Sequence, residues 1–143
     1  MPEQTNSLKT LSSISARYQL SAIYSFGSKG LEVASLVKGE AVDLRRIESD
    51  VDIGVLPQSH VVMSPKHKVQ LSIELEELLD IYRIDLIALP DADPFLAVNI
   101  IRGERIYCAD EYRVDEYELY VLRRAGDLIP LEQERIRLIL GED

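Results

Sequence analysis

Residues 49–56 read SDVDIGVL, in which acidic or small side chains alternate with apolar ones. This alternation predicts a strand with one buried side, and Pro57 ends it because proline has no N–H to donate to a neighbouring strand. Side chains two residues apart point to the same side of a strand, with Cα atoms roughly 6 to 7 Å apart. The segment therefore predicts a strand that carries the carboxylates of Asp50 and Asp52 on one side.

Two further apolar runs predict the strands with which this one would pair in a sheet. Residues 20–26 are apolar and aromatic and stop at Gly27-Ser28, which predicts a buried strand followed by a tight turn. Residues 84–89 are almost continuously apolar and stop at Pro90, which favours a central position in a sheet. Asp85 lies in this run, so three carboxylates come together if the strands are neighbours.

Helical periodicity separates and follows the strands, which predicts an α/β fold, called α+β in some schemes, with a mixed sheet flanked by helices. One domain over residues 1–143 suffices, with a flexible tail at 1–7 and a C-terminal helical segment at 112–143. The remaining predicted elements are helices at 8–18, 29–37 ended by Gly39, 65–80 capped by Ser64, 94–102 between Asp93 and a cap at Gly103, a short edge strand at 105–108, and helices at 114–124 and 131–140 broken near Gly126 and Pro130.

Composition excludes several classes of protein. Of 143 residues 46% are hydrophobic, which suffices for a core, and the 25 acidic against 16 basic residues give a net charge of −9. This charge disfavours direct binding to nucleic acid or to an anionic membrane. Cys108 is the one cysteine and no apolar run approaches the roughly 20 residues that span a bilayer, so we expect a soluble, reduced, cytoplasmic protein.

The predicted carboxylates and the first turn together suggest phosphate chemistry. Carboxylate oxygens on adjacent strands are suited to Mg²⁺, and two-metal phosphoryl-transfer sites hold their ions about 3.5 to 4 Å apart. Asp85 among apolar neighbours is costly to bury without a cation. Gly27 lets the backbone approach a phosphate, Ser28 supplies a hydroxyl, and Lys29 adds a positive charge.

The motif order Gly-Ser, then Asp-x-Asp, then a third Asp on a later strand resembles the minimal nucleotidyltransferase domains of the DNA polymerase β superfamily. In this chain the motifs are FGSKG at 26–30, SDVDIGVL at 49–56 and IDLI at 84–87, and the resemblance extends to the helix at 94–103. It implies the polymerase-β-type fold and transfer of a nucleoside monophosphate from a nucleoside triphosphate to an acceptor hydroxyl, with ATP as the expected donor.

The resemblance also implies a role for each motif residue. Asp50 and Asp52 would hold two Mg²⁺ ions, and Asp85 would hold the catalytic ion and take the acceptor's proton. The triphosphate would be seated by Gly27, Ser28 and Lys29. Two features depart from the family: 21 residues separate Ser28 from Asp50, and Lys29 replaces the arginine of many relatives. The role of the resulting loop at 38–49, with Arg45 and Arg46 as further candidate triphosphate contacts, stays open.

Minimal members of the superfamily are often antitoxins paired with a small helical HEPN-type toxin, which they silence by binding or by adding nucleotides to a tyrosine. The acidity of this chain agrees with a protein acceptor. Aromatic and aliphatic residues of the C-terminal segment, including Tyr112, Tyr117 and Tyr120, offer anchors for a toxin or for a homodimer, although such a helix more often packs on its own domain. The alternatives are a non-catalytic antitoxin, a nucleotide-binding partner protein, or a structural homo-oligomer.

Overall fold

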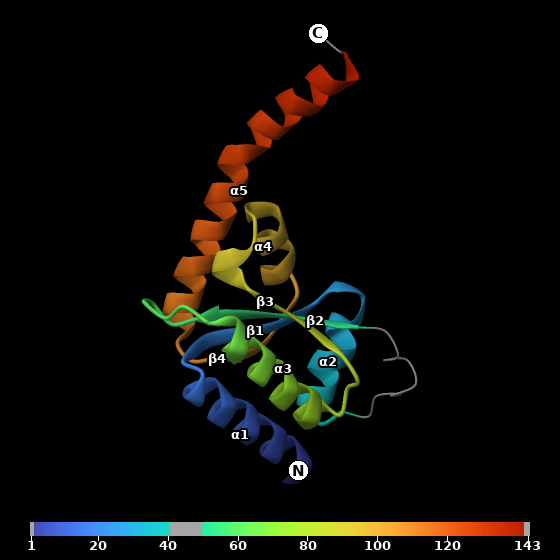
Figure 1. Ribbon diagram of the computed structural model, residues 1–143, viewed down its shortest axis with the longest axis vertical. Helices are drawn as coiled ribbons and strands as arrows, with labels where there is room; N and C mark the ends of the chain where they lie inside the picture. Colours follow the sequence, from blue (N-terminus) through green and yellow to red (C-terminus); the bar gives the residue numbers. More distant parts are fainter. Residues whose placement is uncertain (1, 41–49, 142–143) are drawn as a thin grey trace.

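The part of the chain that the structure describes forms one four-stranded sheet with five longer helices around it. The computed structural model describes the backbone of residues 2–40 and 50–141 (Figure 1). In chain order the elements are α1 (Pro2–Arg17), β1 (Leu20–Phe26), the 3₁₀ turn η1 (Gly27–Lys29), α2 (Gly30–Val37), β2 (Val51–Pro57), α3 (Pro65–Leu79), β3 (Ile84–Ala88), the 3₁₀ turn η3 (Leu89–Asp91), α4 (Pro94–Ile101), β4 (Glu104–Cys108) and α5 (Glu111–Leu140).

The sheet is mixed, with strand order β3-β2-β1-β4. β1 runs antiparallel to both β2 and β4, whereas β2 and β3 are parallel. Helices α1, α2 and α3 cover one face, and α4 and α5 cover the other (Figure 1). The C-terminal half of α5 extends beyond the rest of the chain. This architecture confirms the predicted mixed sheet flanked by helices.

Each face of the sheet has its own hydrophobic core, because successive strand residues point to opposite sides. On β1, Ile23 packs with α1, α2 and α3, while Ala22 and Tyr24 pack with α4 and α5. The hydroxyl of buried Tyr24 donates a hydrogen bond to Glu118, and Arg105 of β4 binds the same carboxylate. These bonds fix the first half of α5 on the sheet.

Local sequence signals placed several elements correctly. The strands at 20–26 and from Val51 to Pro57 are as predicted. Ser64 caps α3, its hydroxyl accepting from the N–H of His67 at 3.1 Å. Asp93 caps α4 by accepting from Phe95 and Leu96, and Gly39 ends α2 with a φ of +81°. Side-chain caps of this kind satisfy N–H groups that the first helical turn leaves without partners.

Four predictions about the elements need correction. β3 is an edge strand of the described sheet rather than a central one, and its apolar side chains are covered by helices. The N-terminal helix begins at Pro2, within the expected flexible tail. α5 is continuous through Gly126 and Pro130, because Pro130 is exposed and costs the helix one backbone hydrogen bond where water can replace it. Gly103 does not cap α4 in a left-handed conformation. Among the described glycines, a positive φ is found at Gly27, Gly39 and Gly141.

The described helices include none long and apolar enough to cross a membrane. The longest, α5, carries charged residues along its whole length.

Gly54 of β2 lies where α4 packs closest to the sheet. A Cβ atom added there would stand 2.4 Å from Cγ2 of Ile100, which is fully buried. Gly54→Ala is therefore expected to lower the free energy of unfolding by about 1 to 3 kcal/mol, the usual cost of overfilling a core. Urea denaturation measures this. A double variant with Ile100→Ala should cost less than the sum of the two single changes, and strict additivity would contradict the proposed contact.

Candidate active site

The predicted site residues gather at one edge of the sheet, where β2 and β3 begin and β1 ends. Asp52 on β2 lies opposite Asp85 on β3 and opposite Phe26, the last residue of β1. Neighbouring strands are about 4.8 Å apart, so the two aspartates are adjacent residues on parallel strands. Gly27 follows Phe26 directly at the same edge. Three segments far apart in sequence thus meet at this edge, which the sequence analysis expected on the condition that the strands are neighbours.

The carboxyl of Asp52 lies in an electrostatically unfavourable position. Burial raises its pKa above the ordinary value, and the neighbouring carboxylates of Asp85 and Asp50 raise it further. Negative charges brought together without a cation disfavour ionisation, so the site is more favourable once a cation is bound. A bound cation would offset the part of this shift that comes from the neighbouring carboxylates.

Asp50 stands apart from the other two carboxylates. It lies one residue before β2, and its side chain is 46% exposed, with Oδ2 3.7 Å from Nε of Arg83. The backbone N–H of Val51 donates to the carbonyl of Arg83 at 3.1 Å, which holds the two chain segments together. An ion pair this exposed contributes little stability. Asp50 can therefore exchange Arg83 for another cation at low cost.

The three carboxylates do not form a complete metal-binding cluster by themselves. Among the side chains that the structure describes, those of residues 7–40 and 50–141, no three of His, Cys, Asp or Glu are grouped so as to hold a metal ion. Mg²⁺, however, is commonly bound by one or two carboxylates together with water and substrate phosphates. The adjacent oxygen donors of Asp52 and Asp85, and the mutual repulsion of the carboxylates, fit that mode of binding.

The Asp52 carboxylate packs directly against Gly27, where any larger residue would contact it. Its φ of +74° is a left-handed conformation, and a Cβ atom at this position would lie 2.4 Å from Oδ2 of Asp52. Ser28 is exposed and Lys29 half-buried in the same turn, η1, directly before α2. Ser28 and Lys29 therefore directly follow the glycine that lies against the Asp52 carboxylate.

Three supporting residues were missed by sequence reasoning. Ser25 is fully buried, and its hydroxyl donates to the carbonyl of Gly30 at 2.8 Å, which fastens η1 to the end of β1. Gly103 passes so close that a Cβ atom there would stand 2.4 Å from the carbonyl oxygen of Ser25. Arg83 pairs with Asp50. Two sequence features could have indicated these roles: Ser25 is a polar residue inside an apolar strand, and Arg83 lies two residues before Asp85.

The loop with the candidate contacts Arg45 and Arg46 lies largely outside the described residues, which stop at Glu40 and resume at Asp50. Its role stays a prediction.

Comparison with known proteins identifies the family of this edge-of-sheet site. The sequence pattern of the family described as "Polymerase beta, Nucleotidyltransferase" matches residues 9–112. The chain belongs to this nucleotidyltransferase family. The matched part contains all six predicted site residues: Gly27, Ser28, Lys29, Asp50, Asp52 and Asp85. No curated protein matches the chain.

Solved structures share the nucleotidyltransferase fold over almost the whole chain. A chain from the structure of a tri-AMPylated Shewanella oneidensis HEPN toxin with its MNT antitoxin is 18% identical, with a TM-score of 0.66, covering 96% of this chain and 98% of that one. A chain from a toxin–antitoxin structure with AMP-PNP is 18% identical, with a TM-score of 0.65 and coverages of 93% and 98%. A chain from the toxin–antitoxin MntA-HepT is 16% identical, with a TM-score of 0.66 and coverages of 95% and 98%.

Proposed function

We propose that this chain transfers a nucleoside monophosphate, AMP from ATP, to an acceptor hydroxyl in a Mg²⁺-dependent reaction. One observation carries the proposal: Asp52 and Asp85 are register neighbours on parallel strands, and Gly27 leaves the space beside the Asp52 carboxylate open. Burial and the nearby carboxylates of Asp85 and Asp50 together raise the pKa of Asp52, and perturbed carboxyl groups of this kind are frequent at functional sites. The family assignment supports the same chemistry.

Each site residue has a distinct task in the proposed reaction. Asp50, Asp52 and Asp85 would hold two Mg²⁺ ions, for which Asp50 would exchange its ion pair with Arg83. Bound Mg²⁺ neutralises phosphate charge and stabilises the charge that develops during transfer. Gly27, Ser28 and Lys29 bind the triphosphate. Asp85 takes the acceptor's proton as the acceptor oxygen bonds to the α-phosphorus, and the bond to the bridging oxygen breaks so that pyrophosphate leaves.

For the acceptor we propose a tyrosine hydroxyl on a small helical HEPN-type toxin, which makes the chain an antitoxin. The similar structures support this partner, because one holds a tri-AMPylated HEPN toxin with its MNT antitoxin and another holds AMP-PNP. A net charge of −9 favours a protein acceptor over a nucleic acid. A cytoplasmic location fits an ATP-dependent reaction and a chain with one cysteine.

Isothermal titration of ATP and the other nucleoside triphosphates, with and without Mg²⁺, tests the site. We expect Mg²⁺-dependent binding to the natural chain and binding weakened at least about tenfold in Asp50→Asn, since each 1.4 kcal/mol of lost interaction is a factor of ten. Asp91→Asn is the matched control: Asp91 follows β3 and pairs with Lys68 on the surface, so its removal should leave the titration unchanged.

Absence of binding by any triphosphate would overturn the catalytic proposal. The favoured function would then be the non-catalytic antitoxin, which acts by binding its partner.

A further inference from the structure

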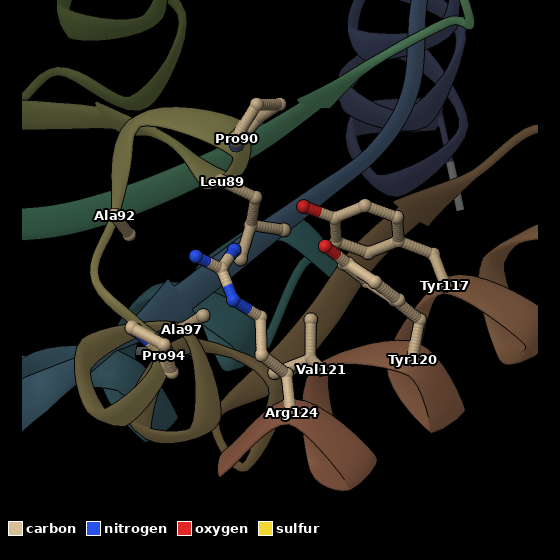
Figure 2. Close-up of a pocket in the computed structure, with 9 residues that line it drawn as sticks. All are labelled: Leu89, Pro90, Ala92, Pro94, Ala97, Tyr117, Tyr120, Val121 and Arg124. Atoms are coloured by element: carbon tan, nitrogen blue, oxygen red, sulfur yellow. The ribbon is translucent and has the colours of Figure 1, made fainter. Parts of the chain in front are cut away.

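A small pocket lies between α5 and the segment from η3 to α4, on the face of the sheet that α4 and α5 cover (Figure 2). It borders the end of β3 opposite to Asp85, because Leu89 directly follows that strand. Its floor is formed by the buried side chains of Leu89, Ala97 and Val121. The pocket is therefore separate from the candidate active site and is not used by the proposed reaction.

Three polar groups gather over this apolar floor. Tyr117, Tyr120 and Arg124 project from the same side of α5 with their polar ends turned toward Leu89 (Figure 2). The two tyrosine rings are tilted by 48° with centroids 5.8 Å apart. Burial and the neighbouring Tyr120 phenol raise the pKa of the Tyr117 phenol, and the positive charge of Arg124 opposes this shift. The pocket thus presents two phenols and a cation.

Arg124 is exposed and, like its neighbour Arg123, has no carboxylate partner among the described residues. Among the residues that the structure describes, ion pairs join Arg17, Lys68, Arg83, Arg105, Arg113, Arg135 and Arg137 to acidic side chains, and none involves Arg124. Acidic side chains outnumber basic ones by nine. An unpaired guanidinium beside two phenols in such a chain is complementary to a carboxylate supplied from outside.

The size of the pocket favours side chains over a small-molecule ligand. Its volume is about 210 Å³, which is below the 300 to 1,000 Å³ typical of ligand sites. One or two amino-acid side chains fill such a space. Tyrosine and arginine are also enriched among the residues that contribute most to protein–protein binding, which they do in pockets that exclude water.

The helix that forms the pocket has further apolar residues without cover in this chain. Leu119, Leu122 and Ile129 of α5 are 52%, 44% and 45% exposed. A second hollow lies on the other side of the α4–α5 pair, lined by Phe95, Leu122 and Ile129 among others. These residues lie further round α5 from the pocket and are not part of its lining.

We propose that this pocket is the docking site of a partner protein that inserts an apolar side chain onto the Leu89, Ala97 and Val121 floor and places a neighbouring Asp or Glu carboxylate against Arg124 and the two phenols. The inference rests on the proposed function, in which a protein is the acceptor. Because the pocket borders the end of β3 opposite to Asp85, docking leaves the carboxylate edge free to receive the acceptor hydroxyl.

A blocked dipeptide, N-acetyl-Phe-Glu-amide, is the probe of this chemistry, and N-acetyl-Phe-Gln-amide is its uncharged control. Titration into the full chain is followed by ¹H–¹⁵N NMR. We expect saturable shifts at Tyr117, Tyr120, Val121 and Arg124 with the Glu peptide, and binding at least about tenfold weaker with the Gln peptide. Arg124→Gln should weaken binding of the Glu peptide by the same factor, because the hydrogen bond between the guanidinium and the carboxylate is lost.

Arg123→Gln is the matched control, since Arg123 is the exposed neighbour of Arg124, about 100° further round the helix. It makes the same change in net charge and should leave the titration unchanged. Tyr120→Phe retains the ring but loses the hydroxyl. It should weaken binding of the Glu peptide by a smaller factor than Arg124→Gln does. If the Glu and Gln peptides bind equally, or if Arg123→Gln has as large an effect as Arg124→Gln, the proposal is wrong.

Two measurements separate this proposal from its competitors. Sedimentation of the natural chain and of Arg124→Gln tests for a second copy in the pocket: a dimer that Arg124→Gln dissociates would overturn docking of a different protein. ATP titration in Mg²⁺ reports on the carboxylate edge alone and should be unchanged in Arg124→Gln. If the natural chain binds ATP but not the Glu peptide, the docking site alone is refuted, and if it binds the Glu peptide but no triphosphate, the proposed function alone is refuted.

Discussion

Replacing Asp52 with Asn is expected to lower nucleotide transfer by about 10³-fold or more while making the metal-free protein more stable at neutral pH. The loss of activity follows because Asp52 is the carboxylate placed beside both Asp85 and Gly27. Metal-ion stabilisation of developing charge amounts to several kcal/mol, and each 1.36 kcal/mol is tenfold in rate. Asn keeps the size of the side chain but removes its charge.

The gain in stability follows from the raised pKa of Asp52. A carboxyl with a higher pKa in the folded than in the unfolded chain destabilises the fold when ionised, so stability rises as pH falls from its folded pKa toward its unfolded pKa of about 3.9. Asp52→Asn should therefore melt higher than the natural chain at pH 7 in EDTA. The difference should shrink as the pH is lowered toward 4.

Transfer assays and thermal melts between pH 4 and 8 test both halves of this prediction. Added Mg²⁺ should raise the melting temperature of the natural chain more than that of the variant, because ligands stabilise the state they bind. Asp91→Asn should retain transfer, since Asp91 pairs with Lys68 away from the carboxylates. An Asp52→Asn protein that transfers nucleotide normally, or that melts lower than the natural chain at pH 7 in EDTA, would contradict the assignment.

The sequence was sufficient where a signal is local. Alternation of apolar side chains predicted the β2 strand, and the capping roles of Ser64 and Asp93 followed from their places before a helical proline. The meeting of Asp52 with Asp85 depended only on two strands being neighbours and on the aspartates starting them in the same register. The sequence analysis left the first as a condition, and the structure meets it because β2 and β3 are parallel neighbours.

Prediction failed where the outcome depends on packing between distant segments. The apolar run of β3 suggested a central strand, but helices cover its side chains at an edge equally well. Pro130 suggested a break in the last helix, yet the loss of one hydrogen bond on an exposed helix is tolerated. The pairing of Asp50 with Arg83 depends on side-chain positions that no spacing rule specifies.

Gly27→Ala is expected to reduce transfer by about 10²-fold through a change at a residue that carries no chemistry itself. The added Cβ would stand 2.4 Å from Oδ2 of Asp52, so the carboxylate has to move. Misplacement of a reacting or binding group by about 1 Å costs about a hundredfold in rate. The left-handed backbone of Gly27 adds a stability cost of roughly 1 to 2 kcal/mol for alanine.

Two glycine controls separate these contributions. Gly141 also has a positive φ, +73°, but a Cβ atom added there would have no neighbour within 4 Å, so Gly141→Ala tests backbone strain alone. Gly126→Ala is in open space within α5 and should stabilise the chain by about 0.5 to 1 kcal/mol, because glycine is a poor helix former. Neither control should change the rate of transfer by folded protein.

Gly27→Asn then decides between strain and steric contact with Asp52. Asparagine adopts the left-handed conformation more readily than alanine, so Asn should recover part of the melting temperature that Gly27→Ala loses. It still carries a Cβ atom, so transfer should stay about as low as in Gly27→Ala. Recovery of transfer together with stability would mean that Gly27 serves the turn alone, and that the space beside Asp52 is not what the reaction requires.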